Sequence, residues 1–338
     1  MSKVVYLIGA GASYGQRKKN NVGEDIPGEI VRGLPIVSEL DVAIDLYCSS
    51  ISTRTYRSDS SIVSDYPCLL KELRWLREMC KTYPTIDTYA KKLAVTSDSY
   101  NLIRLKNALS AYFVLTQDHN KRDLRYDGFV ASIIQDDGTL PKDVSVLSWN
   151  YDCQMEYVLR DFSSSKSDMY QLWKNKGIVC KGFDLPIDCS RFNLVKLNGT
   201  AMFSTDNGRF LIERKSYELA EFEIKCKDDY LSWRNNLSFA WEKDDQFYDS
   251  ILPLVSDVET LVVIGYSFPY VNRTIDRKLI QRMNDLKIVY IQDKAASDVQ
   301  QSFETLLSSN QQNSLKRNEL LIRPRTAVNQ FIIPNELT

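Results

Sequence analysis

Short runs of apolar residues without hydrophobic–polar alternation recur along this chain. The first covers residues 4–8, and largely apolar runs follow at 144–149, 194–197, 260–264 and 287–291. Such runs are typical of strands that are buried on both faces of a parallel sheet. Helical patterns follow several of them, for example at 152–159 and 272–283. The pattern therefore predicts an α/β fold with a Rossmann-like parallel sheet and helices on both faces.

The stretch between the first two of these runs has a helical pattern instead. Apolar residues recur at three- and four-residue spacing at 68–76 and 102–113, which predicts amphipathic helices. Residues 16–33 are polar and contain glycine, so we expect a mobile loop, followed by a helix that starts at Pro35 or Ser38. We predict three parts: the first strand and phosphate loop at 1–38, a helical insert at 39–138, and the remainder of the Rossmann-like core at 139–338.

Composition narrows the class of protein. Of the 338 residues, 43% are hydrophobic, which is enough for one large core. The net charge of −1 gives no basic field that would attract nucleic acid. No apolar run approaches the ~20 residues that span a bilayer, and the early first strand leaves no room for a signal peptide. We therefore expect a cytoplasmic protein that has no nucleic-acid or membrane partner.

Seven cysteines are scattered along the chain without any C-x-x-C pair. This spacing fits neither a disulfide framework nor a zinc ribbon, so we expect free thiols and no metal site. Cys153 follows Asp152 and is a tempting nucleophile, but the single histidine, His119, gives no sign of pairing with it. We therefore interpret Cys153 as a buried structural thiol.

The first strand ends in the small residues GAGAS at 9–13. Small residues allow a sharp turn and a close approach of a ligand to the backbone. If a helix starts near Ala12, its free N–H groups point at this gap and attract a phosphate. The motif is not the dehydrogenase fingerprint, because Tyr14 occupies the third glycine position. The turn is thus either a nucleotide site or a tight strand–helix connection.

Three further strand ends carry unusual residues: SWNYD at 148–152, KLNGT at 196–200 and GYSF at 265–268. The carboxyl ends of parallel strands share one edge, where ligands bind. Together with GAGAS and the pair Leu34-Pro35, their order resembles the sirtuin-like (Sir2-type) NAD-consuming family, especially its bacterial anti-phage branch. That branch has a TNYD-like strand end, a K-L-H-G motif and a late G-Y-S-F.

The resemblance assigns roles to matching residues. It implies that the turn after the first strand, residues 10–13, wraps the NAD pyrophosphate. It also implies that Asn150 and Asp152, at the end of the next strand, face the nicotinamide ribose and amide. The late motif would line the adenosine-ribose and phosphate side, and the end of the last strand would lie near the adenine. The implied catalytic residues are Asn150, Asp152 and Asn198, and the implied NAD-binding residues are Ala10, Gly11, Ala12, Ser13, Pro35, Gly265, Tyr266, Ser267 and Asp293.

Structural roles compete with several of these assignments. Asn150 and Asp152 follow a strand and precede a helical pattern, where Asn and Asp are preferred as caps. Gly265 fits a tight turn without a ligand. Asp293 fits a surface carboxylate at a strand end.

One departure from the family motif affects the chemistry. Asn198 stands where the family has the histidine that acts as general base, and an amide cannot take up a proton near neutral pH. The sequence leaves three explanations open: inactivation by substitution, a natural binding module without catalysis, or an enzyme that uses Asp152 or water.

The resemblance implies an NAD hydrolase that releases nicotinamide and ADP-ribose as an effector of anti-phage defence by abortive infection. Its helical insert would pack over the nucleotide edge of the sheet. We expect a homo-oligomer or a partner in trans, such as a translocase-like ATPase or another defence protein. The alternative is a non-catalytic NAD- or ADP-ribose-binding scaffold or regulatory subunit. The sirtuin zinc-ribbon cysteines are missing, which argues against a protein deacylase.

Overall fold

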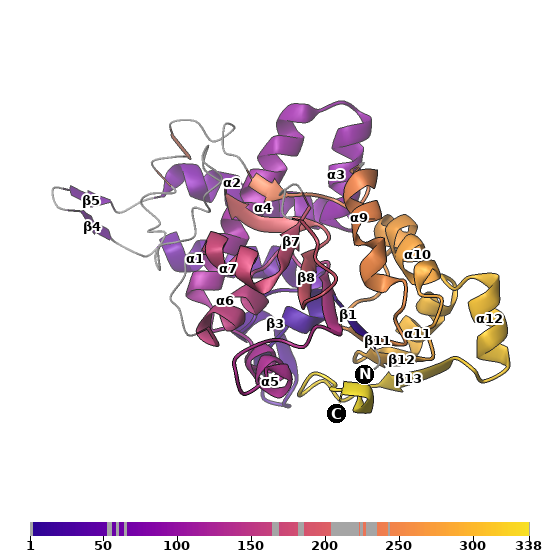
Figure 1. Ribbon diagram of the computed structural model, residues 1–338. Helices are drawn as coiled ribbons and strands as arrows, with labels where there is room; N and C mark the ends of the chain where they lie inside the picture. Colours follow the sequence, from indigo (N-terminus) through magenta and orange to yellow (C-terminus); the bar gives the residue numbers. More distant parts are fainter. Residues whose placement is uncertain are drawn as a thin grey trace.

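The centre of the molecule is a seven-stranded parallel sheet with the order β13-β12-β11-β1-β6-β8-β7. The structure is a computed structural model that describes residues 3–52, 56–58, 61–63, 66–163, 169–181, 186–203, 223, 226–227, 235–242 and 244–337. The strands are β1 (Val4–Ile8), β6 (Val144–Ser148), β7 (Ile178–Cys180), β8 (Asn193–Lys196), β11 (Thr260–Ile264), β12 (Ile288–Gln292) and β13 (Leu321–Arg325). Helices lie on both sides of this sheet (Figure 1), so the predicted Rossmann-like α/β fold is confirmed.

The central strand β1 shows why its sequence has no polar positions. All five of its residues are buried. Val4, Tyr6 and Ile8 pack into one hydrophobic cluster, whereas Val5 and Leu7 pack into a second cluster on the opposite face. Because successive side chains of a strand point to opposite faces, burial on both sides requires a continuous apolar run.

Two sets of helices cover the two faces of the sheet. The first cluster contains residues of α1 (Leu40–Ser52), α2 (Pro67–Thr82), α3 (Ile86–Val95), α4 (Ser99–His119), α5 (Leu124–Ile133), α6 (Gln154–Asp161) and α7 (Met169–Lys176). The second contains or contacts residues of α9 (Asp245–Val255), α10 (Arg273–Arg282), α11 (Ala296–Glu304) and α12 (Ser309–Lys316). The helices α1–α5 fall within the stretch where the sequence predicts a helical insert.

Residues 16–33 are not the predicted loop. They form an antiparallel hairpin of β2 (Gln16–Lys19) and β3 (Asp25–Arg32). Arg17 is only 1% exposed, and its Nη2 lies 2.7 Å from Glu39 Oε2 and donates to Leu34 O. A buried ion pair with a residue 22 positions away therefore anchors the hairpin, and no local polarity pattern can indicate such a partner.

The remaining elements are short. The turn η2 (Val37–Glu39) leads into α1, close to the predicted helix start. Two further antiparallel pairs are β4 (Tyr56–Ser58) with β5 (Ser61–Val63), and β9 (Gly199–Phe203) with β10 (Asn235–Leu237). Two further short 3-10 turns are η5 (Tyr270–Asn272) and η6 (Asn335–Leu337). A third such turn, η1 (Ala10–Ser13), follows β1.

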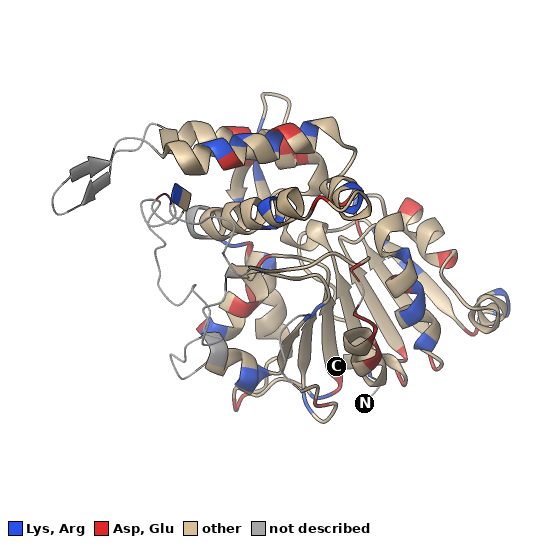
Figure 2. Cartoon of the chain, turned by 90° about the horizontal axis from the view of Figure 1, so that it is seen from above, with Lys and Arg blue, Asp and Glu red and all other residues tan. Residues whose placement is uncertain are grey.

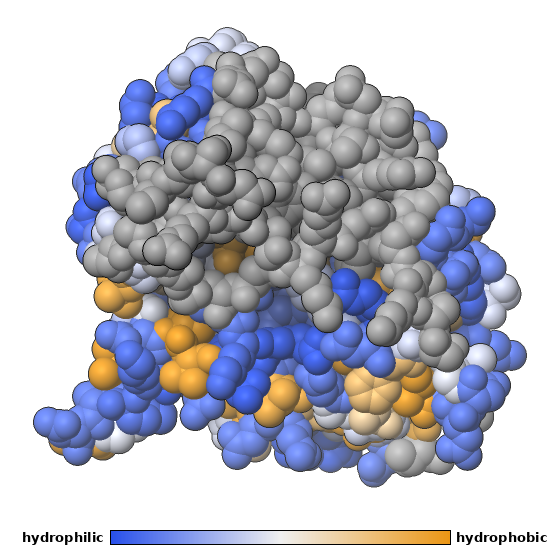
Figure 3. Space-filling model, turned by 90° about the vertical axis from the view of Figure 1, so that its left-hand side faces the viewer, coloured by the Kyte–Doolittle hydropathy of each residue, from blue (hydrophilic) through white to orange (hydrophobic). Residues whose placement is uncertain are grey.

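Charged residues lie mainly on helices and loops, while the strands of the sheet carry few of them (Figure 2). The side of the molecule turned to the viewer in Figure 3 is mostly hydrophilic where it is coloured, with several separate apolar patches. Within the described parts of the chain, no helix combines the length and the apolar character needed to cross a membrane.

Candidate functional site

The strand order places a ligand-binding position at the carboxyl end of β1. The chain runs from β1 to β6 and β8 on one side, and then crosses to β11, β12 and β13 on the other. In open α/β sheets, ligands bind where the strand order reverses in this way. Two cavities lie there, with volumes of about 270 Å³ and about 870 Å³, here called the smaller and the larger cavity. Gly265 and Ile36 line both of them.

The smaller cavity brings together most of the predicted site residues. It is lined by Ala10, Ser13, Pro35, Asn150, Asp152, Asn198, Gly265, Tyr266 and Ser267. Gly11 and Asp293 line the larger cavity instead. Ala12 lines neither cavity, because it is fully buried in the first hydrophobic cluster.

A buried hydrogen-bond network orders the floor of the smaller cavity. Asn150 Nδ2 donates to Gly9 O at 2.9 Å and to Ser13 Oγ at 3.0 Å. Ser13 Oγ donates to Asp152 Oδ2 at 2.7 Å. Asp152 Oδ1 accepts the backbone N–H of Gln154 at the start of α6. Asp152 therefore holds the turn before α6, whose N-cap residue is Cys153 without a side-chain cap, so neither Asn150 nor Asp152 is the helix cap that the alternative interpretation proposed. Asn150 instead ties β6 to the first turn.

Buried contacts also hold the residues next to Asp152 in place. Lys196 Nζ donates to Asp152 O and lies 3.1 Å from Glu156 Oε1, and both side chains are buried. Cys153 is fully buried, its Sγ lies 3.3 Å from Thr200 Oγ1, and burial raises the pKa of its thiol well above the ordinary value. The predicted buried thiol is confirmed, and a group so protonated is a poor nucleophile.

Two buried amide oxygens near the smaller cavity have no hydrogen-bond partner among the described residues. Asn198 follows β8 and is 4% exposed, and Asn272 in η5 is 5% exposed; both line the smaller cavity. Neither Asn198 Oδ1 nor Asn272 Oδ1 accepts a hydrogen bond from any described residue. An unsatisfied buried acceptor costs about 1–3 kcal/mol. Both oxygens are closed off from solvent in this structure, so a donor in the cavity reaches them only if the two side chains turn.

Tyr266, which also lines the smaller cavity, belongs to a second buried hydrogen-bond network. Tyr266 OH donates to Asp276 Oδ2 at 2.7 Å, Trp149 Nε1 donates to Asp276 Oδ1 at 3.1 Å, and Asn272 Nδ2 donates to Tyr266 OH. Burial raises the pKa of Asp276 to about 8. The Tyr266 hydroxyl thus forms its hydrogen bonds within this buried network. Asp276 was not identified from the sequence.

The glycines of the first turn have a structural explanation. A Cβ at Gly11 would lie 2.7 Å from Gly265 Cα, and a Cβ at Gly265, where φ is +57°, would lie 2.3 Å from the carbonyl carbon of Gly11. The two turns contact each other backbone to backbone, and Gly11 N donates to Gly265 O at 2.9 Å. The tight-turn interpretation of Gly265 therefore holds, although this residue also lines both cavities.

No α-helix starts near Ala12, so the condition for a phosphate site at a helix start is not met. Residues Ala10–Ser13 form only a short 3-10 turn, η1, and the chain then enters the hairpin at Gln16. The Ala12 N–H donates to Gly9 O. The dipole of a full helix is absent from this turn, and the Gly11 and Ala12 N–H groups are already used within the protein.

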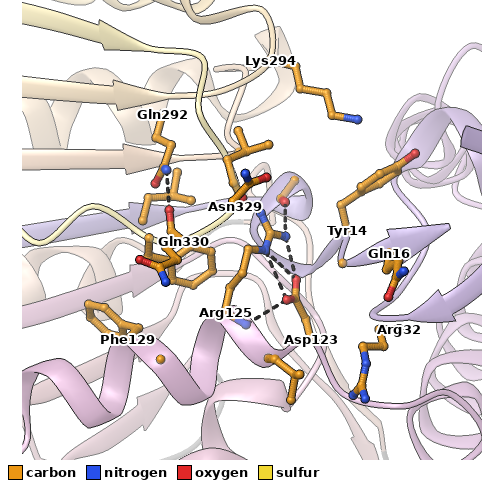
Figure 4. Close-up of a pocket in the computed structure, with 18 of the residues that line it drawn as sticks. Tyr14, Gln16, Arg32, Asp123, Arg125, Phe129, Gln292, Lys294, Asn329 and Gln330 are labelled. Carbon is orange, nitrogen blue, oxygen red and sulfur yellow. Dashed lines mark hydrogen bonds and ion pairs between the residues drawn. The ribbon is translucent and has the colours of Figure 1, made fainter. Parts of the chain in front are cut away.

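The larger cavity contains most of the charged side chains near the site. Its described lining includes five basic residues, Arg17, Lys19, Arg32, Arg125 and Lys294, and three acidic residues, Asp25, Asp123 and Asp293. Figure 4 shows Arg125 beside Asp123, with Lys294 and Arg32 on other sides of the cavity. Ion pairs occupy most of these cations, but Arg32 has no carboxylate partner among the described residues, and its Nη1 donates to Arg122 O. The cavity therefore retains a cation for an anionic ligand.

Aromatic rings and the end of the chain complete the larger cavity. Tyr14 and Phe129 line it, as does the C-terminal segment with Phe331 (Figure 4). Asp293 is half-buried, and its Oδ1 accepts the backbone N–H of Ala295 before α11. Asp293 is thus both a cavity residue and part of a helix start, and its Oδ2 is not used in that contact.

Several site residues escaped the sequence analysis. Asp87 of α3 lines the smaller cavity and Arg32 of β3 lines the larger one. Both come from elements inserted between β1 and β6, where no strand end marks a ligand position. Asn272 and Asp276 follow the GYSF motif by a few residues, and this closeness in sequence was the signal that could have identified them as site residues.

No protein-family model matches the sequence, and no curated protein is significantly similar to it. Within the part of the chain that the structure describes, no group of three His, Cys, Asp or Glu residues is placed to hold a metal ion.

Proposed function

We propose that this protein is an NAD hydrolase that splits NAD into nicotinamide and ADP-ribose. The observation that carries the proposal is the convergence of Asn150, Asp152 and Asn198 from two strand ends on one cavity at the point where the strand order reverses. The cation in the adjoining cavity supports a ligand with phosphates. The unsatisfied oxygens of Asn198 and Asn272, two residues that line the smaller cavity, support a ligand with hydrogen-bond donors towards which these side chains turn.

The two adjoining cavities suit the two halves of NAD. The smaller cavity would take the nicotinamide ribose, and Asn198 and Asn272 would turn their Oδ1 atoms to accept hydrogen bonds from the carboxamide or a ribose hydroxyl. The larger cavity would take the ADP half, with Arg32 beside the phosphates and Asp293 Oδ2 beside the ribose hydroxyls. The pyrophosphate would cross at Gly265, which lines both cavities.

The residues of the smaller cavity match the charge that this reaction develops. The bond between the ribose and the nicotinamide nitrogen breaks, the electron pair leaves with neutral nicotinamide, and positive charge grows on the sugar. The Nδ2 of Asn150 is occupied by Gly9 and Ser13, so its Oδ1 is the atom left to stabilise that charge. Preorganised oxygens of this kind lower the barrier because they need no rearrangement.

A second candidate function is binding of NAD or ADP-ribose without turnover. Asn198 favours it, because an amide at this position cannot act as a base. In either case the role in anti-phage defence and the partner in trans rest on the resemblance of the four strand-end motifs to the sirtuin-like family. The cytoplasmic location rests on the scattered cysteines and the short apolar runs of the sequence.

The test is to incubate the purified chain with NAD and to quantify nicotinamide and ADP-ribose, beside the variant Asn198→His. A histidine supplies a group with a pKa near neutrality. Turnover should therefore rise by ~10²-fold or more at nearly constant affinity for NAD if the wild type has no base, and by less if another residue already takes up the proton. Calorimetry with NAD separates binding from chemistry. If both proteins bind NAD and neither releases nicotinamide, the hydrolase proposal is wrong and the binding function replaces it.

A further inference from the structure

We infer that Asp87, which α3 of the insert carries into the smaller cavity, is the general base of this site. The inference rests on the proposed function, because it names the group that takes the proton which Asn198 cannot accept. Asp87 lies in the first turn of α3 and lines the same cavity as Asn150 and Asn198.

The other ionisable residues of the cavity are unsuited to this task. Among its described lining residues, these are Tyr151, Asp152 and Tyr266. Burial raises the pKa of both tyrosines well above the ordinary value, so they stay protonated. Asp152 accepts hydrogen bonds from Ser13 Oγ and from the backbone N–H of Gln154, which holds it as a structural acceptor. Asp87 is the remaining carboxylate.

The surroundings of Asp87 leave its carboxylate available. No other described side chain donates a hydrogen bond or an ion pair to it. Thr85 caps α3 by accepting the backbone N–H of Thr88 at 3.1 Å, and Ile86 is buried, so the helix start is firmly held. The charge of Asp87 contributes to raising the pKa of Tyr151 and of Tyr266. Tyr151 and Tyr266 follow β6 and β11 and line the same cavity as Asp87.

The protonation state of Asp87 suits a base. Burial raises its pKa to about 6, so the group is ionised at neutral pH and accepts a proton more readily than an exposed aspartate. The titratable groups that face the same cavity are Tyr151, Tyr266 and Asp152, with Asp276 behind Tyr266. The pKa of Asp276 is about 8, so its titration falls above that of Asp87.

The proposed step is balanced without a further reactant. The bond between the ribose carbon and the nicotinamide nitrogen breaks, and its electron pair leaves with nicotinamide. The oxygen of a water molecule forms a bond to that carbon, and the water proton passes to the Asp87 carboxylate and then to solvent. The products are ADP-ribose, nicotinamide and one proton.

The test compares the pH dependence of kcat in the wild type with that of Asp87→Asn. The wild-type kcat should fall as the pH drops below about 6, because Asp87 then becomes protonated. Asp87→Asn should lower kcat by ~10²-fold or more with KM little changed and without this acidic limb. The variant Asp136→Asn removes an exposed carboxylate that lines neither cavity, and it should behave as the wild type.

A rescue experiment separates a base from a structural residue. Adding Asn198→His to Asp87→Asn should restore turnover by at least ~10-fold, because the imidazole supplies a new proton acceptor. Should Asp87→Asn fail to fold, as judged by circular dichroism, Asp87→Ser takes its place, and the wild-type pH profile still decides.

The outcomes distinguish this inference from the proposed function. Full activity of Asp87→Asn, or a wild-type profile that is flat between pH 5 and 7, would overturn the role of Asp87 and leave the hydrolase standing. An inert wild type with an active Asn198→His variant would do the same. If no variant releases nicotinamide from NAD, the proposed function fails and the inference falls with it.

Discussion

Asp276 should make the stability of this protein fall as the pH rises. The carboxyl is 1% exposed, and its folded-state pKa is raised by burial from 3.8 to about 8. The folded state therefore holds a proton that the unfolded state releases, so stability is complete below about pH 4 and is lost as the pH rises towards 8. Each pH unit in this window costs roughly 1.4 kcal/mol, or about 4 kcal/mol between pH 4 and pH 7.

The substitution Asp276→Asn isolates this contribution. A protonated Asp and an Asn have nearly the same shape. Each keeps an acceptor oxygen for Trp149 Nε1, and each places a donor next to Tyr266 OH, whose hydroxyl then accepts. Urea unfolding of both proteins at several pH values gives the free energy of unfolding for each. The two curves should nearly coincide at and below about pH 4 and diverge above it, with the variant more stable by a few kcal/mol at pH 7. Parallel curves across this range would refute the reasoning, since Asp276 would then be ionised in the folded protein.

Three further outcomes are expected. Gly265→Ala should lower the melting temperature strongly, because φ is +57° at this position and the new Cβ would clash with the backbone of Gly11. The control Gly138→Ala, where φ is +78° and the space is open, should lower the free energy of unfolding by only about 1 kcal/mol. Equal losses of stability in thermal denaturation would contradict this. Arg32→Gln should raise the KM for NAD by roughly tenfold with little change in kcat, because only substrate binding loses a charge-assisted contact, and the exposed Arg282→Gln serves as its control; an unchanged KM would remove Arg32 from the site. Light scattering at micromolar concentration should give the mass of a homo-oligomer, and a monomer with full NAD turnover would contradict that expectation.

The layout of the core could be predicted from the sequence because buried parallel strands carry a local signature. The apolar runs correspond to β1, β6, β8, β11 and β12. The edge strand β13 escaped prediction because it is mostly exposed and contains Pro324, and edge strands need neither an apolar face nor every backbone donor. The hairpin of β2 and β3 escaped because its anchor, the buried pair of Arg17 and Glu39, depends on a distant partner.

The same division holds for the candidate site. Strand-end motifs placed Asn150, Asp152 and Asn198 correctly at one edge, since parallel strands align their carboxyl ends. Only the tertiary structure decided which atoms remain without a hydrogen-bond partner in the protein. The Gly11 N–H donates to Gly265 O, whereas Asn198 Oδ1 has no partner among the described residues. It also brings Asp87 from the insert into the cavity. A strand end is a local property of sequence, whereas burial and hydrogen-bond partners arise only when segments far apart in the chain pack together.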